Sequence, residues 1–216
     1  MSNNWIRVSC ATLCRIEHQG RFLLLLNANR RGKGLYVLAP IGGAITVYDW
    51  SALALMGALP EEPLTHDLRF QMPLDHLQDF RAWFYRGDER ERSPYRELRE
   101  ELVQETDLLP VLSPDDVTCR YLWTVEEEQF TARQGQTGLL THYFLEIFDI
   151  KFTTARTLGP LLALPPGSGA AWVPQDVIAD CSTVTLSVDG ETRTVQVHAT
   201  VLLRSPTART DAPAPD

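Results

Sequence analysis

The sequence predicts one domain of the mixed α/β or α+β class. Segments rich in β-branched and apolar residues are interleaved with segments whose apolar residues recur at helical spacing. The 216 residues are 44% hydrophobic and 22% charged, which suits a globular domain with a sizeable core. Neither an internal repeat nor a linker divides the chain. We expect a single domain over residues 1–204 and a disordered tail at 205–216, where prolines recur.

The individual elements follow from local patterns. Two β-rich segments around a turn at 17–20 predict an early hairpin, and Ser93 with Pro94 marks the start of a helix that continues to about Thr106. A loop is expected at 159–169, where Pro and Gly cluster. The strands expected are 8–16, 21–26, 35–39, 117–125, 138–152, 170–173, 183–188 and 192–203, and the helices are 51–59, 74–85, 93–106 and 174–179, with 197–203 open to either assignment.

Charge and composition exclude several classes of protein. A formal net charge of -8 argues against binding of extended nucleic acid. The four cysteines lack the close spacing of a zinc site, so they are expected to be reduced. The longest apolar stretch, 35–60, is interrupted too often by Pro and Gly to span a membrane, and the first residues do not form a signal peptide. We therefore expect a cytoplasmic protein that does not bind membranes.

The densest acidic stretch lies between Gly87 and Asp107, where eight carboxylates accompany four arginines. On a helix, apolar residues fall on one side of this stretch, and Glu97, Glu100 and Glu101 fall on the other. Like charges at this spacing repel one another, and a divalent cation such as Mg²⁺, which prefers oxygen ligands, would relieve the repulsion. A solvated surface helix with Arg–Glu pairs fits the periodicity equally well.

Spacing favours the first interpretation. Asp88, seven further residues, and then the run 96–101 (Arg-Glu-Leu-Arg-Glu-Glu) resemble the Nudix box, and Pro40-Ile41-Gly42-Gly43 resembles the loop that precedes this box. The resemblance covers most of residues 7–203. It implies a Nudix-type α/β/α sandwich with a mixed central sheet and a helical insertion at about 44–86. The long insertion and the segment 67–70 look most like the SMODS-associated NUDIX group, which the resemblance links to bacterial nucleotide signalling and defence against phages.

The chain departs from the family pattern at several positions. Asp88 replaces the usual glutamate, and the insertion separates it from Gly43. The box normally closes with any residue, a glycine and an aliphatic residue. Here the closing segment comes later in the chain, as Thr106-Asp107-Leu108, as though the helix had gained one turn. A rival register that starts at Glu101 would lose the arginine and one glutamate, so the register that starts at Arg96 is preferred.

Site roles follow from the resemblance. The implied ligands of Mg²⁺ or Mn²⁺ are Glu97, Glu100 and Glu101, and the implied catalytic residues are Glu97, Arg96 and Asp88, with Arg96 paired to Asp88. The implied substrate-binding residues are Gly42 and Gly43, which allow close backbone approach. Arg30 and Arg31 could grip a phosphate or form a plain basic turn. The general base is either Glu97 or one of Glu126, Glu127 and Glu128. His142 is expected to be a satisfied structural histidine.

The implied reaction is metal-dependent hydrolysis of the pyrophosphate bond in a nucleoside diphosphate linked to another group. The partner is then a small nucleotide, and a homodimer through the helices of the insertion is reasonable. A second hypothesis is a nucleotide sensor of the same fold without turnover, because Asp88 replaces the usual glutamate, the box glycine is displaced and Thr46 lies in a loop where active relatives often place an acid. A third is a partner-binding module that uses the inserted helices.

Overall fold

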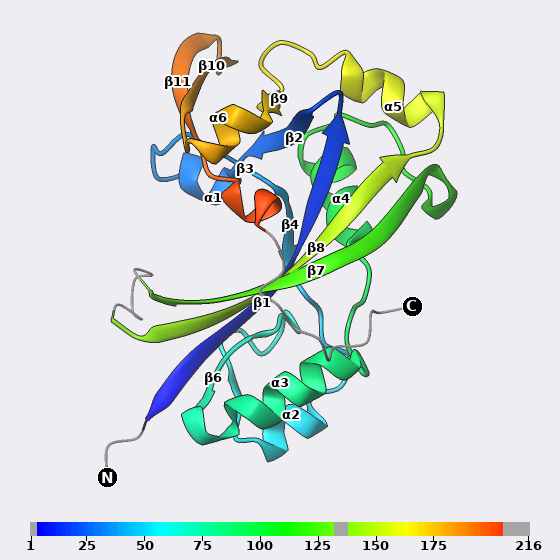
Figure 1. Ribbon diagram of the computed structural model, residues 1–216. Helices are drawn as coiled ribbons and strands as arrows, with labels where there is room; N and C mark the ends of the chain where they lie inside the picture. Colours follow the sequence, from blue (N-terminus) through cyan, green and yellow to red (C-terminus); the bar gives the residue numbers. More distant parts are fainter. Residues whose placement is uncertain (1–3, 132–137, 205–216) are drawn as a thin grey trace.

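The long strand β1 (Trp5–His18) runs through the molecule from one end to the other, as Figure 1 shows. The computed structural model describes residues 4–131 and 138–204. The other strands are β2 (Arg21–Leu26), β3 (Val37–Ala39), β4 (Ile41–Ala44), β5 (Leu59–Pro60), β6 (Arg69–Pro73), β7 (Val117–Phe130), β8 (Leu140–Phe152), β9 (Ala170–Pro174), β10 (Thr183–Val188) and β11 (Glu191–Val197).

Helices are short and lie on both sides of the strands. The α-helices are α1 (Ala28–Arg31), α2 (Ser51–Leu55), α3 (Leu77–Arg86), α4 (Tyr95–Arg99), α5 (Ala155–Leu162) and α6 (Gln175–Ala179). The 3₁₀ turns are η1 (Leu74–His76), η3 (Pro114–Asp116) and η4 (Thr200–Leu203), and α4 continues as a π-helix, η2 (Glu100–Glu105). With mixed strands between helices, the protein has the expected α/β/α class.

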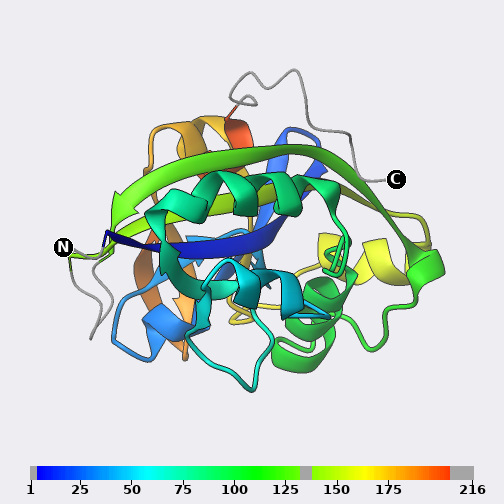
Figure 2. The same cartoon turned by 90° about the horizontal axis from the view of Figure 1, so that it is seen from below.

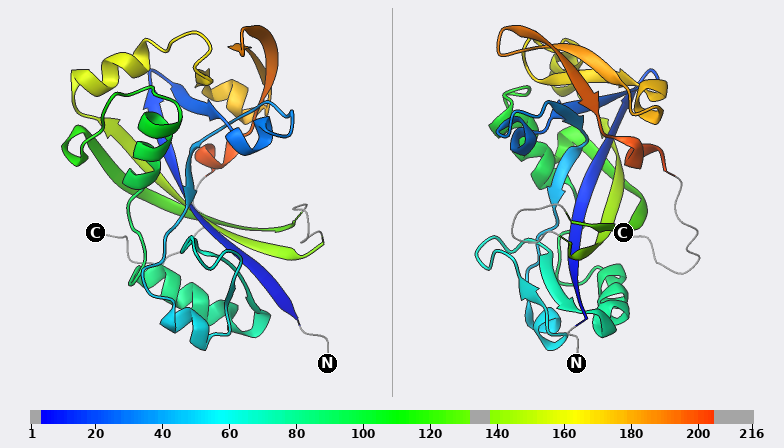
Figure 3. Two further views of the ribbon diagram at one scale, coloured as in Figure 1. Left: turned by 180° about the vertical axis from the view of Figure 1, so that it is seen from behind. Right: turned by 90° about the vertical axis from the view of Figure 1, so that its left-hand side faces the viewer.

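The sheet is mixed because β1 has partners of both directions. On one side it pairs in parallel with β8 over Arg7–Ile16, and β8 in turn pairs with β7 in an antiparallel hairpin. On its other side it pairs antiparallel first with β6 and then with β4. At its C-terminal end β1 forms a hairpin with β2, and β2 pairs with both β9 and β3. Beyond β3 the order of strands is β11 and then β10. Figure 3 shows this second group of strands at the opposite end of the molecule from α2 and α3.

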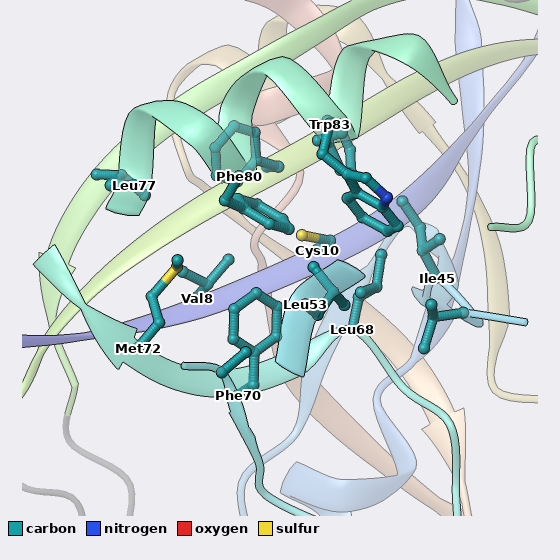
Figure 4. Close-up of a cluster of buried hydrophobic side chains, with 14 of the residues drawn as sticks. Val8, Cys10, Ile45, Leu53, Leu68, Phe70, Met72, Leu77, Phe80 and Trp83 are labelled. Carbon is teal, nitrogen blue, oxygen red and sulfur yellow. The ribbon is translucent and has the colours of Figure 1, made fainter. Parts of the chain in front are cut away.

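The expected insertion forms a layer of its own beneath β1 and β8. Its helix α3 lies across these strands in Figure 2, and the ring of Phe80 stacks edge-on against Phe144 of β8 at 5.3 Å. Figure 4 shows the core that results, in which Val8 of β1 and Phe70 of β6 lie between the helices. Burying this many large apolar side chains stabilises the layer. Two other buried clusters lie under α4 and under the β10–β11 hairpin.

The insertion leaves and re-enters the domain at one place. Val47 and Arg90 form an isolated antiparallel bridge, and the amide of Glu91 donates to the carbonyl of Thr46 at 2.8 Å. The guanidinium of Arg90 is buried, stacks over the ring of Phe84 and pairs with Glu146 of β8 at 2.7 Å. These contacts fix both ends of the insertion to the central sheet.

Several sequence expectations need correction. The segment 159–169, expected to be a loop, overlaps helix α5, because Leu161 is drawn into the core despite Pro160 within the helix. The basic loop after β2 contains helix α1, which begins because the side chain of Asn27 accepts a hydrogen bond from the amide of Arg30. The strand expected at 192–203 ends at Val197 with β11, and of the two assignments open for 197–203 the helical one is found, as the turn η4. The expected tail at 205–216 lies outside the described residues.

The described part of the chain has no helix that is long and apolar enough to cross a membrane.

Candidate active site

A cleft of about 560 Å³ opens beside β4. It is lined by β4, the glutamates of α4 and η2, the end of β2 with α1, the loop 167–169 and part of the insertion. The side chains that bear charge there are Arg31, Asp67, Arg69, Arg96, Glu97, Glu100, Glu101 and Glu105. Such a set can bind polar, charged ligands and offers little to an apolar one.

The backbone of residues 39–46 orders these groups along the cleft. Ala39 pairs with Leu25 of β2 at one end. The amide of Gly42 then donates to Oε1 of Glu101 at 2.8 Å, and the carbonyl of Ala44 accepts from Arg96 at 2.8 Å. At the other end Thr46 forms an isolated bridge with Asp67 of the insertion. The glutamates therefore lie in the middle, between the α1 end and the insertion end.

Gly42 and Gly43, expected in a loop, lie in strand β4, and close approach requires both of them. A Cβ on Gly43 would lie 2.2 Å from Oε2 of Glu97, and one on Gly42 would lie 2.0 Å from the carbonyl oxygen of Thr12. Gly42 also has a φ of 144°, which side-chain-bearing residues rarely adopt. Gly43 thus lets the backbone lie directly against the Glu97 carboxylate, and Gly42 lets it lie directly against β1.

The Arg96 guanidinium binds three carboxylates, and Asp88 is not one of them. It contacts Glu91 at 2.9 Å, Glu97 at 2.7 Å and Glu100 at 3.1 Å. The expected pair of Arg96 with Asp88 is wrong: the Asp88 side chain is 68% exposed and lies 3.7 Å from Arg86. Gly87 and Glu89, which flank Asp88, both have positive φ, so the chain turns sharply there and Asp88 points away. The chain segment that follows the insertion instead brings Glu91 to Arg96.

Burial disturbs the titration of the central glutamates. Burial, with the repulsion of Glu100 and Glu91, raises the pKa of Glu97 to about 7, although Arg96 opposes the shift. Burial likewise raises the pKa of Glu101 to about 8, against the hydrogen bond from Gly42. Burial acts to lower the pKa of Arg96, but its carboxylate neighbours outweigh burial and raise it. The positive charge near Glu97 and Glu101 is thus too small to offset the cost of burying them in the ionised form.

Comparison with known families decides the assignment. The family model described as the SMODS-associated NUDIX domain matches residues 5–203, which is nearly the whole chain. The chain belongs to the SMODS-associated NUDIX domain family. No protein with a curated function matches it. The fold is accordingly a Nudix-type α/β/α sandwich, and the superfamily is one of hydrolases that generally use divalent metals.

The NUDIX domain brings most of the sequence-predicted site residues to one cleft. Gly42, Gly43, Arg31, Arg96, Glu97, Glu100 and Glu101 all line it, whereas Asp88 and Arg30 do not. The Arg31 side chain enters from α1 and is paired with Asp189 of the β10–β11 turn. Arg30 is exposed, and its amide completes the cap of α1.

The acids considered as alternative bases lie elsewhere. Glu126 is held by Arg81, Tyr85 and His142 on the face of β7 that α3 covers. Glu127 pairs with Arg204, and Glu128 with His142 at 3.0 Å. None of the three lines the cleft. His142 is buried between two carboxylates, in the structural role expected of it.

Sequence analysis did not assign a site role to four charged residues that line the cleft or contact Arg96: Glu91, Glu105, Asp67 and Arg69. Glu105 follows Glu101 by four residues and could have been found by extending the helical face. Asp67 and Arg69 lie in the segment 67–70 that carries the subfamily resemblance. The sequence offers no signal for Glu91, because its place depends on where the insertion returns.

The donor set fits a hard divalent cation. Among the described residues, no three His, Cys, Asp or Glu side chains are already arranged as a metal site. The carboxylates of Glu97, Glu100 and Glu101 nevertheless line one cleft around the Arg96 guanidinium, and carboxylate oxygen is the kind of ligand that a hard divalent cation prefers. A cation bound there would relieve the cost of burying them.

Proposed function

We propose that this NUDIX domain is a Mg²⁺- or Mn²⁺-dependent hydrolase that cleaves the pyrophosphate bond of a nucleoside diphosphate linked to another group. The observation that carries the proposal is the position of Glu97 and Glu101. Both carboxylates are held against the Gly42–Gly43 backbone in a polar cleft, with raised pKa values that a bound cation would correct.

The residues of the chain have distinct tasks in this reaction. Glu97, Glu100 and Glu101 would hold the cation, which when bound would neutralise the pyrophosphate and lower the pKa of an attacking water. Arg96 positions Glu97 and Glu100, and Glu91 fixes Arg96 from behind. With 126–128 outside the cleft, Glu97 or another acid of the cleft serves as the base that takes the proton of the water.

The test is phosphate or nucleotide release from a panel of compounds in Mg²⁺, in Mn²⁺ and in EDTA. The panel comprises ADP-ribose, NAD, UDP-glucose, GDP-mannose, dinucleoside polyphosphates, nucleoside triphosphates and cyclic oligonucleotides. Glu101→Gln is expected to reduce turnover at least 100-fold, since a ligand of the cation is lost, and about 3 kcal/mol corresponds to that factor. Glu191→Gln, an exposed acid that pairs with Arg193, is the matched control. Equal turnover by the Glu101→Gln variant and the wild type would refute the role of this glutamate.

A nucleotide sensor is the second candidate function. It is favoured by the ion pairs of Arg96 with Glu97 and Glu100, which occupy carboxylates that a cation would need. If wild type hydrolyses no compound while one of them raises its melting temperature, the sensor is correct. The name of the family suggests a role beside nucleotide-signalling systems, and the cyclic oligonucleotides of the panel address it.

A homodimer through the insertion belongs to the same proposal. Tyr48, Leu55, Leu59 and Leu64 are exposed apolar residues in or beside this segment. Light scattering coupled to size-exclusion chromatography measures the mass directly. A monomer at all concentrations would remove the dimer from the proposal and leave the chemistry unaffected.

A further inference from the structure

Strand β10 forms an open edge of the sheet. It pairs with β11 on one side and stands last in the order of strands, so among the described residues its other side faces no strand. In the same part of the chain, residues 183–188 form no backbone hydrogen bond beyond those of the hairpin. Their outward N–H and C=O groups are therefore available to another strand. Figure 3 shows the β10–β11 hairpin at the end of the molecule opposite α2 and α3.

Other edge strands of the protein have features that oppose pairing with a further strand. Such features are short length, proline, charged side chains and bulges. β5 has only two residues, one of which is Pro60. β7 has a register shift between Tyr121 and Trp123, and the charged side chain of Arg120 is exposed on it. β10 has six residues, Thr-Val-Thr-Leu-Ser-Val, with no charge, no proline and no register shift against β11. Its edge thus lacks these obstacles.

The side chains of β10 are complementary to a second copy of the same strand. Thr183, Thr185 and Ser187 are exposed on one face, and Val184 and Leu186 are partly buried on the other, against the cluster under the hairpin. A two-fold axis through Thr185 would make an antiparallel copy of the strand its neighbour. Thr183 would then lie opposite Ser187, where two hydroxyl groups can form a hydrogen bond. Val184 would lie opposite Leu186, so apolar surface at the edge would be covered.

We propose that β10 is a homodimerisation edge, at which the β10 strands of two copies pair antiparallel about Thr185 and continue the sheet from one copy into the other. Residues 183–187 retain exposed surface and have Thr185 as their midpoint, whereas Val188 is already buried. This interface does not depend on the proposed chemistry and is distinct from a dimer through the insertion. It also bears on the cleft, because Asp189, which follows β10, pairs with Arg31 in the cleft wall.

The first test measures the dimerisation constant. Sedimentation equilibrium over about 5–500 µM covers a Kd of about 10–100 µM, the range expected of wild type for an interface of one short strand pair. Thr185→Lys brings two lysines face to face at the axis and should weaken the dimer about tenfold or more.

Thr194→Lys is the matched control for this test. Thr194 is the exposed cross-strand neighbour of Thr185 on β11, so the same charge is added on the same face, one strand away from the edge. It should leave the Kd within about twofold of that of wild type. Melting temperatures verify that both lysine variants are folded.

The second test determines the register by disulfide formation. In a Cys181→Ser background, which removes the exposed native thiol, Thr185→Cys would place two thiols opposite each other. Directly opposed residues have Cα atoms about 4.5–5.5 Å apart, which suits a disulfide, so mild oxidation should give a covalent dimer. Thr183→Cys in the same background should give none, because the two copies of residue 183 would lie about 13 Å apart along the strands.

Three results would overturn the inference. The first is a wild type that stays monomeric over the whole concentration range. The second is a dimer that Thr185→Lys leaves as stable as before, since its interface then lies elsewhere, as at the insertion. The third is cross-linking of Thr183→Cys in place of Thr185→Cys, which would contradict a two-fold axis through Thr185.

Discussion

Two groups of buried glutamates face different electrostatic surroundings in this molecule. In the cleft, burial raises the pKa of Glu97 to about 7 and of Glu101 to about 8. On β7, burial would also raise the pKa of Glu126, but hydrogen bonds from His142, Arg81 and Tyr85 outweigh it and hold the pKa at about 2. The negative charge of a glutamate is thus poorly compensated in the cleft and well compensated at Glu126 on β7.

The difference distinguishes the glutamates that line the cleft from Glu126, which connects parts of the structure. The partners of Glu126 are side chains of α3 and β8, so its charge connects the insertion to the central hairpin. The partners of the cleft glutamates are one shared arginine and one backbone amide, and the remaining demand for positive charge faces the cleft. Buried acids that lack compensation in a cleft are candidates for binding a cation.

The largest expected effect is that of Gly43→Ala. Its Cβ would collide with the Glu97 carboxylate at 2.2 Å, so that either the backbone or the glutamate must move. We expect turnover to fall at least 100-fold, about 3 kcal/mol of barrier. Gly159→Ala in α5 is the control, since nothing lies within 4 Å of its Cβ and alanine favours a helix. Steady-state kinetics with the best compound of the panel checks both, and full activity of Gly43→Ala would contradict the packing described here.

A second prediction contrasts the two groups in stability. Glu126→Gln should lower the free energy of unfolding by about 2–4 kcal/mol, because Arg81 loses the charge that compensates it. Glu101→Gln in metal-free protein should be neutral or stabilising, since it removes a buried charge without sufficient partners. Urea unfolding at pH 8 in EDTA measures both values. Similar destabilisation by the two variants would break the contrast.

The third prediction concerns Arg96. Glu91→Gln should reduce turnover about tenfold, since about 1.4 kcal/mol of positioning is lost when Arg96 is no longer held. Asp88→Asn should change it less than about twofold, because that side chain is exposed and remote from the arginine. Kinetics of the two variants side by side is the measurement. The reverse order would restore Asp88 as the partner of Arg96.

The last prediction is a pH dependence of opposite sign for the two groups. Glu97 and Glu101 hold protons in the folded state that the unfolded chain releases above about pH 4.3, so stability falls as the pH rises from about 5 to 8. Glu126 has a lowered pKa, so its contribution is lost as the pH falls from about 4.3 to 2. Urea midpoints across the pH range should show Glu101→Gln flattening the alkaline side and Glu126→Gln the acid side. Mg²⁺ should also reduce the alkaline decline if it binds the glutamates.

Local patterns predicted the elements that local forces decide. Strand 21–26 has the expected bounds, and the helical face that carries Glu97, Glu100 and Glu101 does line one cleft. The helix itself changes to a π-helix at Glu100, which periodicity of 3.6 residues cannot indicate. Helix α5 was missed because Gly159 and Pro160 oppose it locally, and burial of its apolar face outweighs them.

The rest of the site depends on contacts between distant segments. Asp67 and Arg69 reach the cleft only because the insertion folds back onto Thr46, and no spacing along the chain indicates this. Glu91 replaces Asp88 for the same reason, since the bridge of Val47 with Arg90 sets the register in which the chain returns. Family resemblance predicted the fold, and its pairing of Arg96 with Asp88 was wrong.

The anchoring of the insertion at Val47 and Arg90 has an evolutionary consequence. Because the segment departs and comes back through adjacent residues, its length and sequence can diverge without displacing the backbone that carries the glutamates. Under the proposed function, a change in this segment would alter which molecules the cleft accepts and leave the glutamates in place. Exchanging this one segment between family members is therefore a direct route to new substrate ranges in the laboratory.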